Sequence, residues 1–217
     1  MAEVRPSTGW GVLHLLLRAR RGEPGAERLL AAIGDFAAAE PNQVIAFSVL
    51  GGRADLGLMA LGPDLDALDR LSKRVLAGPV QAVGSFVSLT EASEYTPTED
   101  DERARLEAEG AADVEGALAE WRARMATYLE HRLHPRLPRR AVIAFYPMSK
   151  SRRPGANWYE LGFGERRRLM GGHARVGRRY AGRVLQLITG ATGLDDWEWG
   201  VTLLADDPAA IKEIVYE

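Results

Sequence analysis

Apolar positions in the first 90 residues change their spacing from segment to segment, which predicts strands that alternate with helices. Short apolar runs at residues 10–17, 43–50, 55–61 and 83–89 have the length and composition of strands. Residues 23–39 carry apolar side chains at helical spacing, and a second helical pattern begins at Pro63-Asp64 and ends at Gly78-Pro79. The predicted order, β-α-β-β-α-β, is that of a ferredoxin-like unit.

The second part of the chain repeats this order after a helical stripe at residues 114–132. Strands are predicted at 142–146, 183–188 and 197–204, helices at 164–173 and from 208, and a Gly- and Asp-rich turn at 190–196. The order β-α-β-β-α lacks a final strand, so either the chain is truncated or its tail is not included. We expect an unpaired sheet edge there, unless a neighbouring subunit covers it.

Residues 90–113 separate the two parts and are strongly acidic, which is typical of a solvated linker or the exposed start of a helix. We therefore predict an α+β protein with one ferredoxin-like half at residues 1–90, an acidic linker at 91–112 and a second half at 113–217. Two such halves in one chain would place two antiparallel sheets face to face as a dimeric α+β barrel.

Composition excludes several classes of function. The 217 residues contain no cysteine, which excludes disulfides, thiolate catalysis, zinc–thiolate sites, iron–sulfur clusters and thiolate-ligated haem. A net charge of −2 gives no electrostatic footprint for nucleic acid. The sequence has no apolar run near the ~20 residues of a membrane span and no signal-peptide pattern, so it predicts a soluble cytoplasmic protein.

His173, one of four histidines, is the first candidate for chemistry. The pattern predicts it at the end of a helix, beside Gly171 and Gly172 and directly before two strands. That position suits a ring that points into a cavity. A surface histidine near a helix end is the simpler interpretation, and by spacing alone it is favoured.

Other candidates lie around the strand at residues 142–146. Tyr146 at its end and Lys150 nearby could form a redox or acid/base group with an anion clamp. From the residues alone, an edge-of-core tyrosine and a solvated lysine are the favoured interpretation. His131 and His134 are one helical turn apart, but a two-histidine metal site lacks an identifiable third ligand. His14 lies in the first predicted strand and is interpreted as a core or surface histidine.

Several longer segments carry a resemblance to a known family. They are AFYPMSK (144–150), NWYELGFGERRRLM (157–170), HARVGRRYAGRV (173–184) and LITGATGLDDWEWGVTLLADDP (187–208). These resemble the chlorite dismutase superfamily, most closely its coproheme decarboxylase branch in the actinobacterial form. GGRADLGLMALGPDLDAL (51–68) and SLTEASEYT (88–96) match the family's first half. The resemblance implies two ferredoxin-like halves, a porphyrin bound in the second, and a homopentamer.

Carried over residue by residue, the resemblance implies that His173 is the axial ligand of porphyrin iron and that Tyr146 abstracts hydrogen from a propionate. Gln186 matches the distal position where chlorite dismutases carry arginine. His131 is the candidate distal base, with His134 as the alternative. The groups implied around the propionates and along the porphyrin walls are Arg132, Met148, Ser149, Lys150, Trp158 and Trp197. The family continues into a further strand with a propionate-binding serine, and this chain ends before it.

The resulting prediction is a hydrogen peroxide-dependent oxidoreductase that converts iron-coproporphyrin III to haem b. Two propionate carboxyl groups are lost as CO2, and the porphyrin is both substrate and redox cofactor. The alternatives are a haem-binding or haem-sensing protein without turnover, and an α+β-barrel binding protein without porphyrin. A chlorite dismutase is disfavoured because Gln186 cannot supply a guanidinium group to an anionic oxidant.

Overall fold

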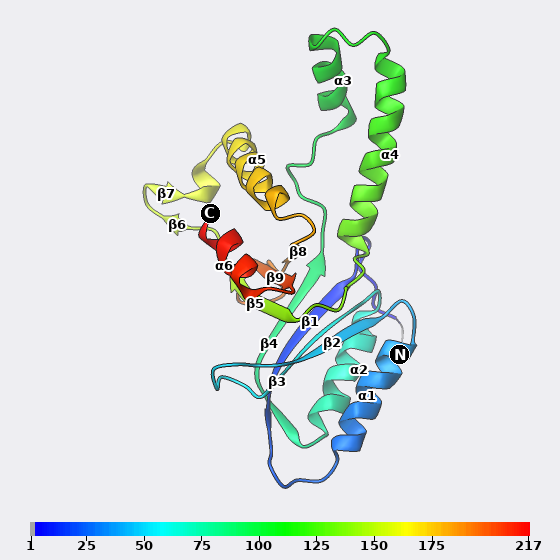
Figure 1. The fold of residues 1–217 in the computed structure, drawn as a ribbon, viewed down its shortest axis with the longest axis vertical. Helices are drawn as coiled ribbons and strands as arrows, with labels where there is room; N and C mark the ends of the chain where they lie inside the picture. The colour runs from blue at the N-terminus through cyan, green and yellow to red at the C-terminus, as the bar shows by residue number, and fades with distance from the viewer. Residues whose placement is uncertain (1–2) are drawn as a thin grey trace.

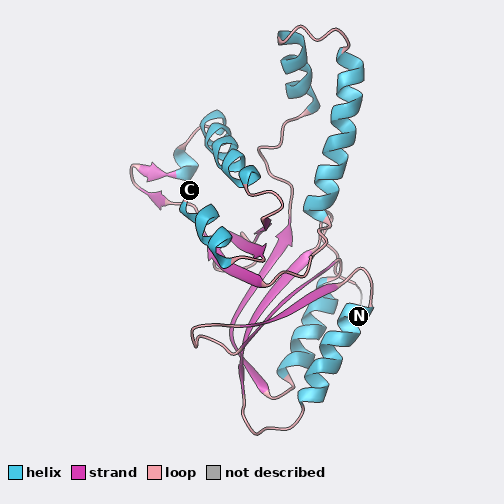
Figure 2. Cartoon of the chain, in the orientation of Figure 1, coloured by secondary structure: helices cyan, strands magenta, loops and turns pink. Residues whose placement is uncertain are grey.

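The computed structural model describes residues 3–217, and its main feature is one seven-stranded antiparallel sheet in the order β2-β3-β1-β4-β8-β9-β5 (Figure 1). Four of its strands, with two helices, make up what we refer to as the N-terminal half. These strands are β1 (Gly11–Ala19), β2 (Gln43–Ser48), β3 (Leu56–Gly62) and β4 (Val80–Thr90). The helices α1 (Ala26–Ala38) and α2 (Leu65–Leu76) lie side by side on one face of these strands (Figure 2).

Local sequence signals account for α2. Asp64 precedes the helix, and its carboxylate accepts a hydrogen bond from the Asp66 N–H at 3.0 Å, as an N-cap should. Leu68, Leu71 and Val75 follow at helical spacing and are buried against the sheet. The predicted element order β-α-β-β-α-β is confirmed for the N-terminal half, with element ends displaced by a few residues.

The C-terminal half contains the other three strands, β5 (Val142–Met148), β8 (Val184–Gly190) and β9 (Trp199–Ala205). β9 lies in the centre and pairs with both neighbours. β8 joins the N-terminal half through only two register pairs with β4, Leu89 with Gly190 and Thr90 with Thr189. Within residues 3–217 the other side of β5 has no strand partner, so β5 is an edge strand.

The sheet curls until its two halves face each other. Three strands separate β1 from β5, so a flat sheet would hold them about 19 Å apart at about 4.8 Å per strand. Instead, the rings of His14 in β1 and Phe145 in β5 are stacked with centroids 3.8 Å apart. Val12 of β1 and Leu187 of β8 likewise share one buried apolar cluster. The inner faces of both halves therefore form a common core.

His14 lies inside this common core. It is therefore a core histidine and not a surface histidine, the two interpretations that the sequence left open. It is 2% exposed, and its Nε2 is 3.0 Å from the Thr202 hydroxyl of β9. Its Nδ1 has no hydrogen-bond partner anywhere in the described part of the chain. Burial lowers the pKa of His14 to about 3.

We expect the protein to lose stability as the pH falls from 6.5, the ordinary pKa of histidine, towards 3. Unfolding exposes the imidazole, which then binds a proton in this window, so stability decreases with falling pH by about 1.4 kcal/mol per unit. Urea unfolding of the wild type and of His14→Gln at pH 6 and pH 5 measures the effect. The variant should show the shallower pH dependence, and equal slopes would contradict the assignment.

The structure corrects the prediction that His173 stands at a helix end. α5 (Phe163–Arg179) continues well beyond it, so His173 lies within the helix. Gly171 and Gly172 do not end the helix because Val176 and Tyr180 continue its apolar stripe and pack against the C-terminal half. α6 (Pro208–Tyr216) packs on the same cluster through Ala210.

The acidic segment predicted as a linker contains a helix, α3 (Glu99–Ala108). Thr98 and Asp101 cap it reciprocally, and acidic side chains occupy its first turn, where the helix dipole favours them. α3 packs against α4 (Val114–Leu133), and the two project from the sheet as a helical hairpin (Figure 1). The domain boundaries at residues 90 and 113 stay a prediction.

The loop after β5 has structure that the sequence did not predict. β6 (Arg152–Arg153) and β7 (Ala156–Asn157) form a short hairpin, followed by a 3-10 turn at Trp158–Glu160.

No helix in residues 3–217 has both the length and the apolar character needed to span a membrane.

Candidate functional site

Helix α5 directs His173 towards the sheet of the C-terminal half. Met170 Sδ is 3.8 Å from Lys150 Nζ, and the Gly177 carbonyl accepts a hydrogen bond from Gln186 Nε2 at 3.2 Å. Positions 170, 173 and 177 are three and four residues apart, so they share one side of the helix. His173 nevertheless has an exposed side chain. The imidazole is therefore accessible to a ligand.

Only the C-terminal end of α5 is packed on the sheet. Val176 and Tyr180 contact the buried cluster there, whereas no residue of α5 itself is fully buried. In Figure 1 the orange end of α5 approaches the sheet near β8, and its yellow end rises away. The raised end is held by an ion pair between Arg167 and Asp101 of α3 (2.9 Å).

Tyr146 and Gln186 lie on the sheet face that α5 covers. Tyr146 pairs with Val201 in β9, and Gln186 pairs with Leu203, two residues further along. Side chains two positions apart on a strand share a face. Tyr146 is 37% exposed, and partial burial raises the pKa of its phenol, which is therefore neutral at pH 7. Met148 shares this face and packs against the buried cluster.

The loop after β5 brings two predicted residues together. The Lys150 ammonium lies 4.5 Å from the centre of the Trp158 ring, a cation–π contact. Lys150 is half-buried, and this burial lowers its pKa, although the nearby Glu198 carboxylate opposes the change. A cavity of about 350 Å³ opens beside Lys150 and Trp158, within the size range of small-molecule sites.

Arg132 lies in the last turn of α4 and is half-buried. Its Nε is buried without a hydrogen-bond partner in residues 3–217. Glu91, close enough to interact electrostatically with Arg132, accepts a hydrogen bond from Trp199 Nε1 at 3.2 Å. Burial raises the pKa of Glu91, and Trp199 and Arg132 oppose the shift. An incoming anion would satisfy the unpaired guanidinium nitrogen.

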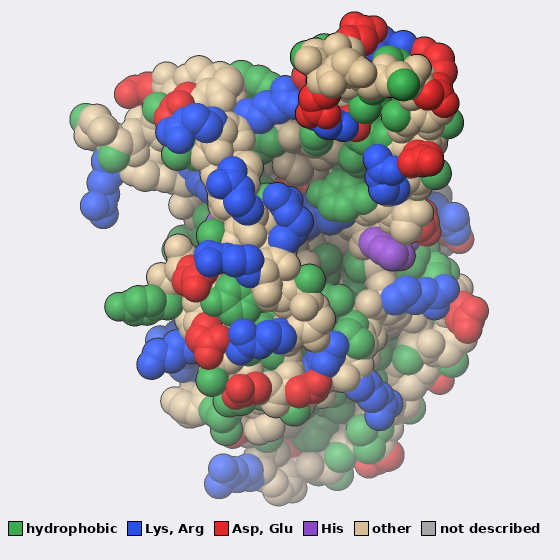
Figure 3. All heavy atoms as spheres, turned by 45° about the horizontal axis from the view of Figure 1, so that its top comes forward, with side chains coloured by type: hydrophobic (Ala, Val, Ile, Leu, Met, Phe, Trp, Pro, Cys, Tyr) green, Lys and Arg blue, Asp and Glu red, His purple; other side chains and the backbone are tan. Residues whose placement is uncertain are grey.

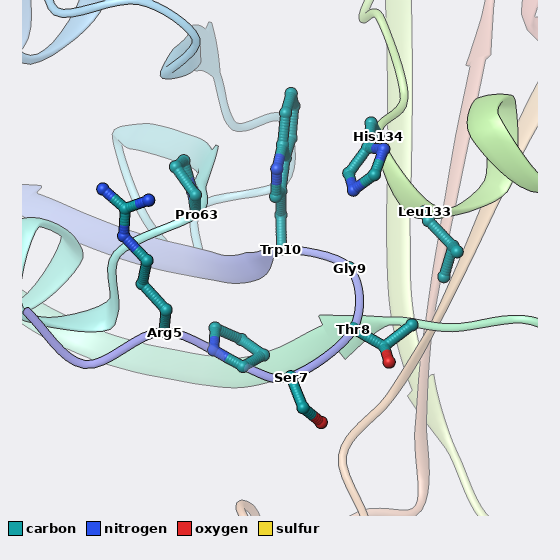
Figure 4. Close-up of a pocket in the computed structure, with 9 residues that line it drawn as sticks. Arg5, Ser7, Thr8, Gly9, Trp10, Pro63, Leu133 and His134 are labelled. Atoms are coloured by element: carbon teal, nitrogen blue, oxygen red, sulfur yellow. The ribbon is translucent and has the colours of Figure 1, made fainter.

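The two histidines of α4 have different surroundings. The His134 ring is 5.2 Å from the Trp10 ring and lines a pocket of about 320 Å³ formed largely by the N-terminal segment (Figure 4). Its Nδ1 is 2.9 Å from a Glu130 carboxylate oxygen. None of the other predicted site residues within the described chain lines this pocket. His131, by contrast, has an exposed side chain.

Ser149 and Trp197 are the remaining predicted site residues, and both are exposed. The Ser149 hydroxyl accepts a hydrogen bond from the Glu198 N–H at 3.2 Å, so it belongs to the same loop network as Lys150. Trp197 is 46% exposed in the turn before β9 and shares no hydrogen bond or ring contact with any residue of the 3–217 range. The structure therefore does not bring Trp197 together with the other predicted residues.

Sequence reasoning missed Tyr95, which lies between the two predicted halves. Its ring stacks on Phe163 at 5.6 Å and meets Trp158 edge-on at 6.5 Å. The acidic character of the segment assigns this residue to a linker, although it belongs to SLTEASEYT, which carries the family resemblance. Glu91, which interacts with Arg132, was missed for the same reason.

Charge is unevenly distributed over the face that contains the site. Acidic side chains gather at the tip of the α3–α4 hairpin, Lys and Arg side chains follow α5, and the surface is hollowed between them (Figure 3). Arg166, Arg167 and Arg168 are consecutive in α5. Arg167 and Arg168 are paired with the carboxylates of Asp101 and Glu165, so the net positive charge that this stretch of α5 offers to an anionic ligand is smaller than three arginines would give.

His173, Lys150 and Arg132 could hold a ligand that carries both a metal ion and carboxylates. Residues 3–217 contain no cluster of three or more His, Asp or Glu side chains that could bind a bare metal ion. Iron in a porphyrin requires only an axial ligand from the protein, and the exposed imidazole of His173 can serve as one. Lys150 and Arg132, with its unpaired Nε, are the donors that carboxylates prefer.

Curated proteins from halophilic archaea are similar in sequence. A protein of Natronomonas pharaonis whose name describes it as heme-binding is 42% identical over 205 residues, covering 92% of this chain and 32% of that protein. A protein of Haloquadratum walsbyi with a name of the same kind is 39% identical over 236 residues, covering 100% and 42%. The chain thus spans less than half the length of these relatives.

Solved structures share the fold. A heme-binding protein from Thermus thermophilus is 31% identical with a TM-score of 0.77, over 99% of this chain and 86% of the other. A mutant chlorite dismutase from Candidatus Nitrospira defluvii is 14% identical with a TM-score of 0.67, covering 97% and 83%, and supports the fold alone. The family model named Chlorite dismutase matches residues 25–217. The chain belongs to the chlorite dismutase family.

Proposed function

We propose that this protein is a coproheme decarboxylase, which uses hydrogen peroxide to convert iron-coproporphyrin III to haem b. The observation that carries the proposal is the position of His173. Its imidazole is exposed on the sheet-facing side of α5, above a sheet face that bears a neutral, accessible phenol, Tyr146. Lys150 and Arg132 are the cations that we propose for the carboxylates of the porphyrin.

The proposed reaction is an oxidative decarboxylation with a defined stoichiometry. Each propionate, R–CH2–CH2–COO⁻, reacts with one H2O2 and one H⁺ to give a vinyl group, CO2 and two H2O. When bound, the iron porphyrin supplies peroxide activation and accepts the electrons. The Tyr146 phenol would lose a hydrogen atom and recover it from the propionate carbon next to the ring. Departure of the carboxylate as CO2 then releases one more electron, which the second oxidising equivalent of the peroxide takes up. His131, exposed at the end of α4, is the proposed base, and Gln186 is proposed on the distal side.

The propionates need a cationic environment. Lys150 and Arg132 come from different elements, the loop after β5 and the end of α4. We propose that they bind propionates together with Ser149 and Met148. Trp158, whose ring lies under the Lys150 ammonium, would form a wall of the porphyrin site. A second wall at Trp197 rests on the family resemblance alone.

Arg132→Ala and Lys150→Ala should each weaken binding of the four-propionate substrate more than binding of two-propionate haem. Each charge-assisted hydrogen bond contributes roughly 1.5–3 kcal/mol, or about tenfold or more in affinity. Titration of the Soret absorption with both porphyrins measures the difference. Equal losses for both ligands would mean that these side chains do not contact the propionates that are removed.

A second candidate function is haem binding or haem sensing without turnover, favoured by the names of the archaeal and Thermus relatives. A chlorite dismutase is less well supported, because Gln186 occupies the position where that activity uses arginine. Titration of the iron-coproporphyrin complex with peroxide, followed by mass spectrometry, tests the proposal. Stepwise loss of two CO2 supports a decarboxylase, whereas bleaching without CO2 loss supports the second candidate.

We further infer that the two halves are ferredoxin-like units that form an α+β barrel. The order β2-β3-β1-β4 within the N-terminal half and the curled sheet support this inference. A homopentamer and a place in cytoplasmic haem biosynthesis follow from the family resemblance and are part of the proposal.

A further inference from the structure

Glu198 is a buried carboxylate directly before β9 and has no role in the chemistry proposed above. It is 7% exposed. Its main chain already joins separate segments: its N–H is shared between the Met148 carbonyl and the Ser149 hydroxyl, both at 3.2 Å. Its carbonyl accepts from the Ala191 N–H at 2.7 Å. The residue therefore sits where the loop after β5 meets the turn between β8 and β9.

The Glu198 carboxylate collects donors from both ends of that loop. One oxygen accepts the backbone N–H of Lys150 at 2.8 Å, and the other forms an ion pair with Arg152. The Tyr159 hydroxyl lies close enough to this carboxylate to lower its pKa, and the Arg152 guanidinium lies 4.0 Å from the centre of the Tyr159 ring. Burial disfavours the charged form, but these hydrogen bonds outweigh burial and hold the pKa of Glu198 below its ordinary value.

The same loop carries three residues assigned to the porphyrin by the proposed function, on which this inference rests: Ser149, Lys150 and Trp158. We infer that Glu198 is a positioning residue that anchors residues 149–159 and so directs the Lys150 ammonium towards the carboxylates of the ligand. It thereby favours porphyrins that carry carboxylates over neutral ones. Glu198 itself is not expected to contact the porphyrin.

If Glu198 acted only through its charge, its neutralisation would have the opposite effect on the affinity for an anionic porphyrin. Removing the negative charge of Glu198 leaves Arg152 unpaired and makes the surroundings of Lys150 more positive, which should tighten anion binding. If positioning dominates, the loop loses its anchor and anion binding weakens. The sign of the change in affinity therefore separates the two accounts.

The test compares Glu198→Gln, Lys150→Met and the double variant with the wild type. Soret titration gives the Kd for iron-coproporphyrin III and for its tetramethyl ester, which has the same ring but no charged carboxylates. We expect Glu198→Gln to weaken binding of the free acid about tenfold and to change binding of the ester less than about twofold. Adding Glu198→Gln to Lys150→Met should weaken binding little further, because both act through one side chain.

Hydrogen–deuterium exchange without porphyrin provides an independent measurement. Amides of residues 149–159 should exchange faster in Glu198→Gln, whereas Asp196→Asn, the same change at an exposed position nearby, should leave exchange and both affinities unchanged. Tighter or unaltered binding of the free acid, or equal weakening of both porphyrins, would overturn the inference, as would unaltered exchange. A wild type that binds neither porphyrin would refute the proposed function, and the exchange result would still decide whether Glu198 anchors the loop.

Discussion

Tyr146→Phe should bind iron-coproporphyrin III almost normally and fail to decarboxylate it. The substitution removes one partly exposed hydroxyl, so affinity should change by no more than about fivefold, the equivalent of one net hydrogen bond. The remaining ring cannot give up a hydrogen atom from oxygen. CO2 release should therefore fall by roughly 100-fold or more, as when a group needed for proton transfer is removed.

Mass spectrometry of the porphyrin after stepwise addition of peroxide measures this loss. Tyr159→Phe is a useful control, because this tyrosine lies in the 3-10 turn at Trp158–Glu160, beside Glu198. Its loss should alter binding more than turnover of the bound porphyrin. Loss of two CO2 from Tyr146→Phe at near wild-type yield would refute the role of Tyr146, and His131 would become the first alternative to examine.

His173→Ala should abolish axial ligation of the iron while leaving the fold intact. The side chain is exposed in the middle of α5, so its truncation should change the free energy of unfolding by no more than about 0.5 kcal/mol. The optical and electron paramagnetic resonance spectra of the ferric complex should lose the features of histidine ligation. Added imidazole should restore them, because the substitution leaves open space beside the helix.

His131→Ala and His134→Ala are the matched controls, since both residues lie at the end of α4 rather than in α5. Each should retain the wild-type ligation spectrum. A histidine-ligated spectrum that persists in His173→Ala without imidazole would show that another residue binds the iron.

Most of the helices and strands could be predicted because capping residues and the spacing of buried apolar side chains indicate the same element. The N-cap Asp64 and the apolar stripe of α2 are adjacent in sequence, so periodicity was sufficient to locate the helix. The course of α5 was not predictable in this way. A glycine pair costs about 1 kcal/mol per residue in a helix, and only the packing of Val176 and Tyr180 on distant strands offsets that cost.

The candidate site was predictable only in part. The resemblance pointed to His173, Tyr146 and Lys150; the structure places α5 against the loop of Lys150 and against β8, and the roles of the three residues are proposals. The Glu198 network could not be inferred from the sequence. Arg152 lies 46 residues from Glu198, and no local pattern indicates that a carboxylate between two tryptophans is buried or that the loop after β5 returns to it.

The contact between His14 and Thr202 has consequences for how the polypeptide is made. The two residues are 188 positions apart, so the common core cannot close until Thr202 has left the ribosome. Until then, Val12, Met59 and Leu61 lack Leu187 as a partner and leave apolar sheet surface uncovered. Contacts of such long range slow folding, and exposed strand surface promotes aggregation. The nascent N-terminal half should therefore depend on chaperones during synthesis more than its compact secondary structure would suggest.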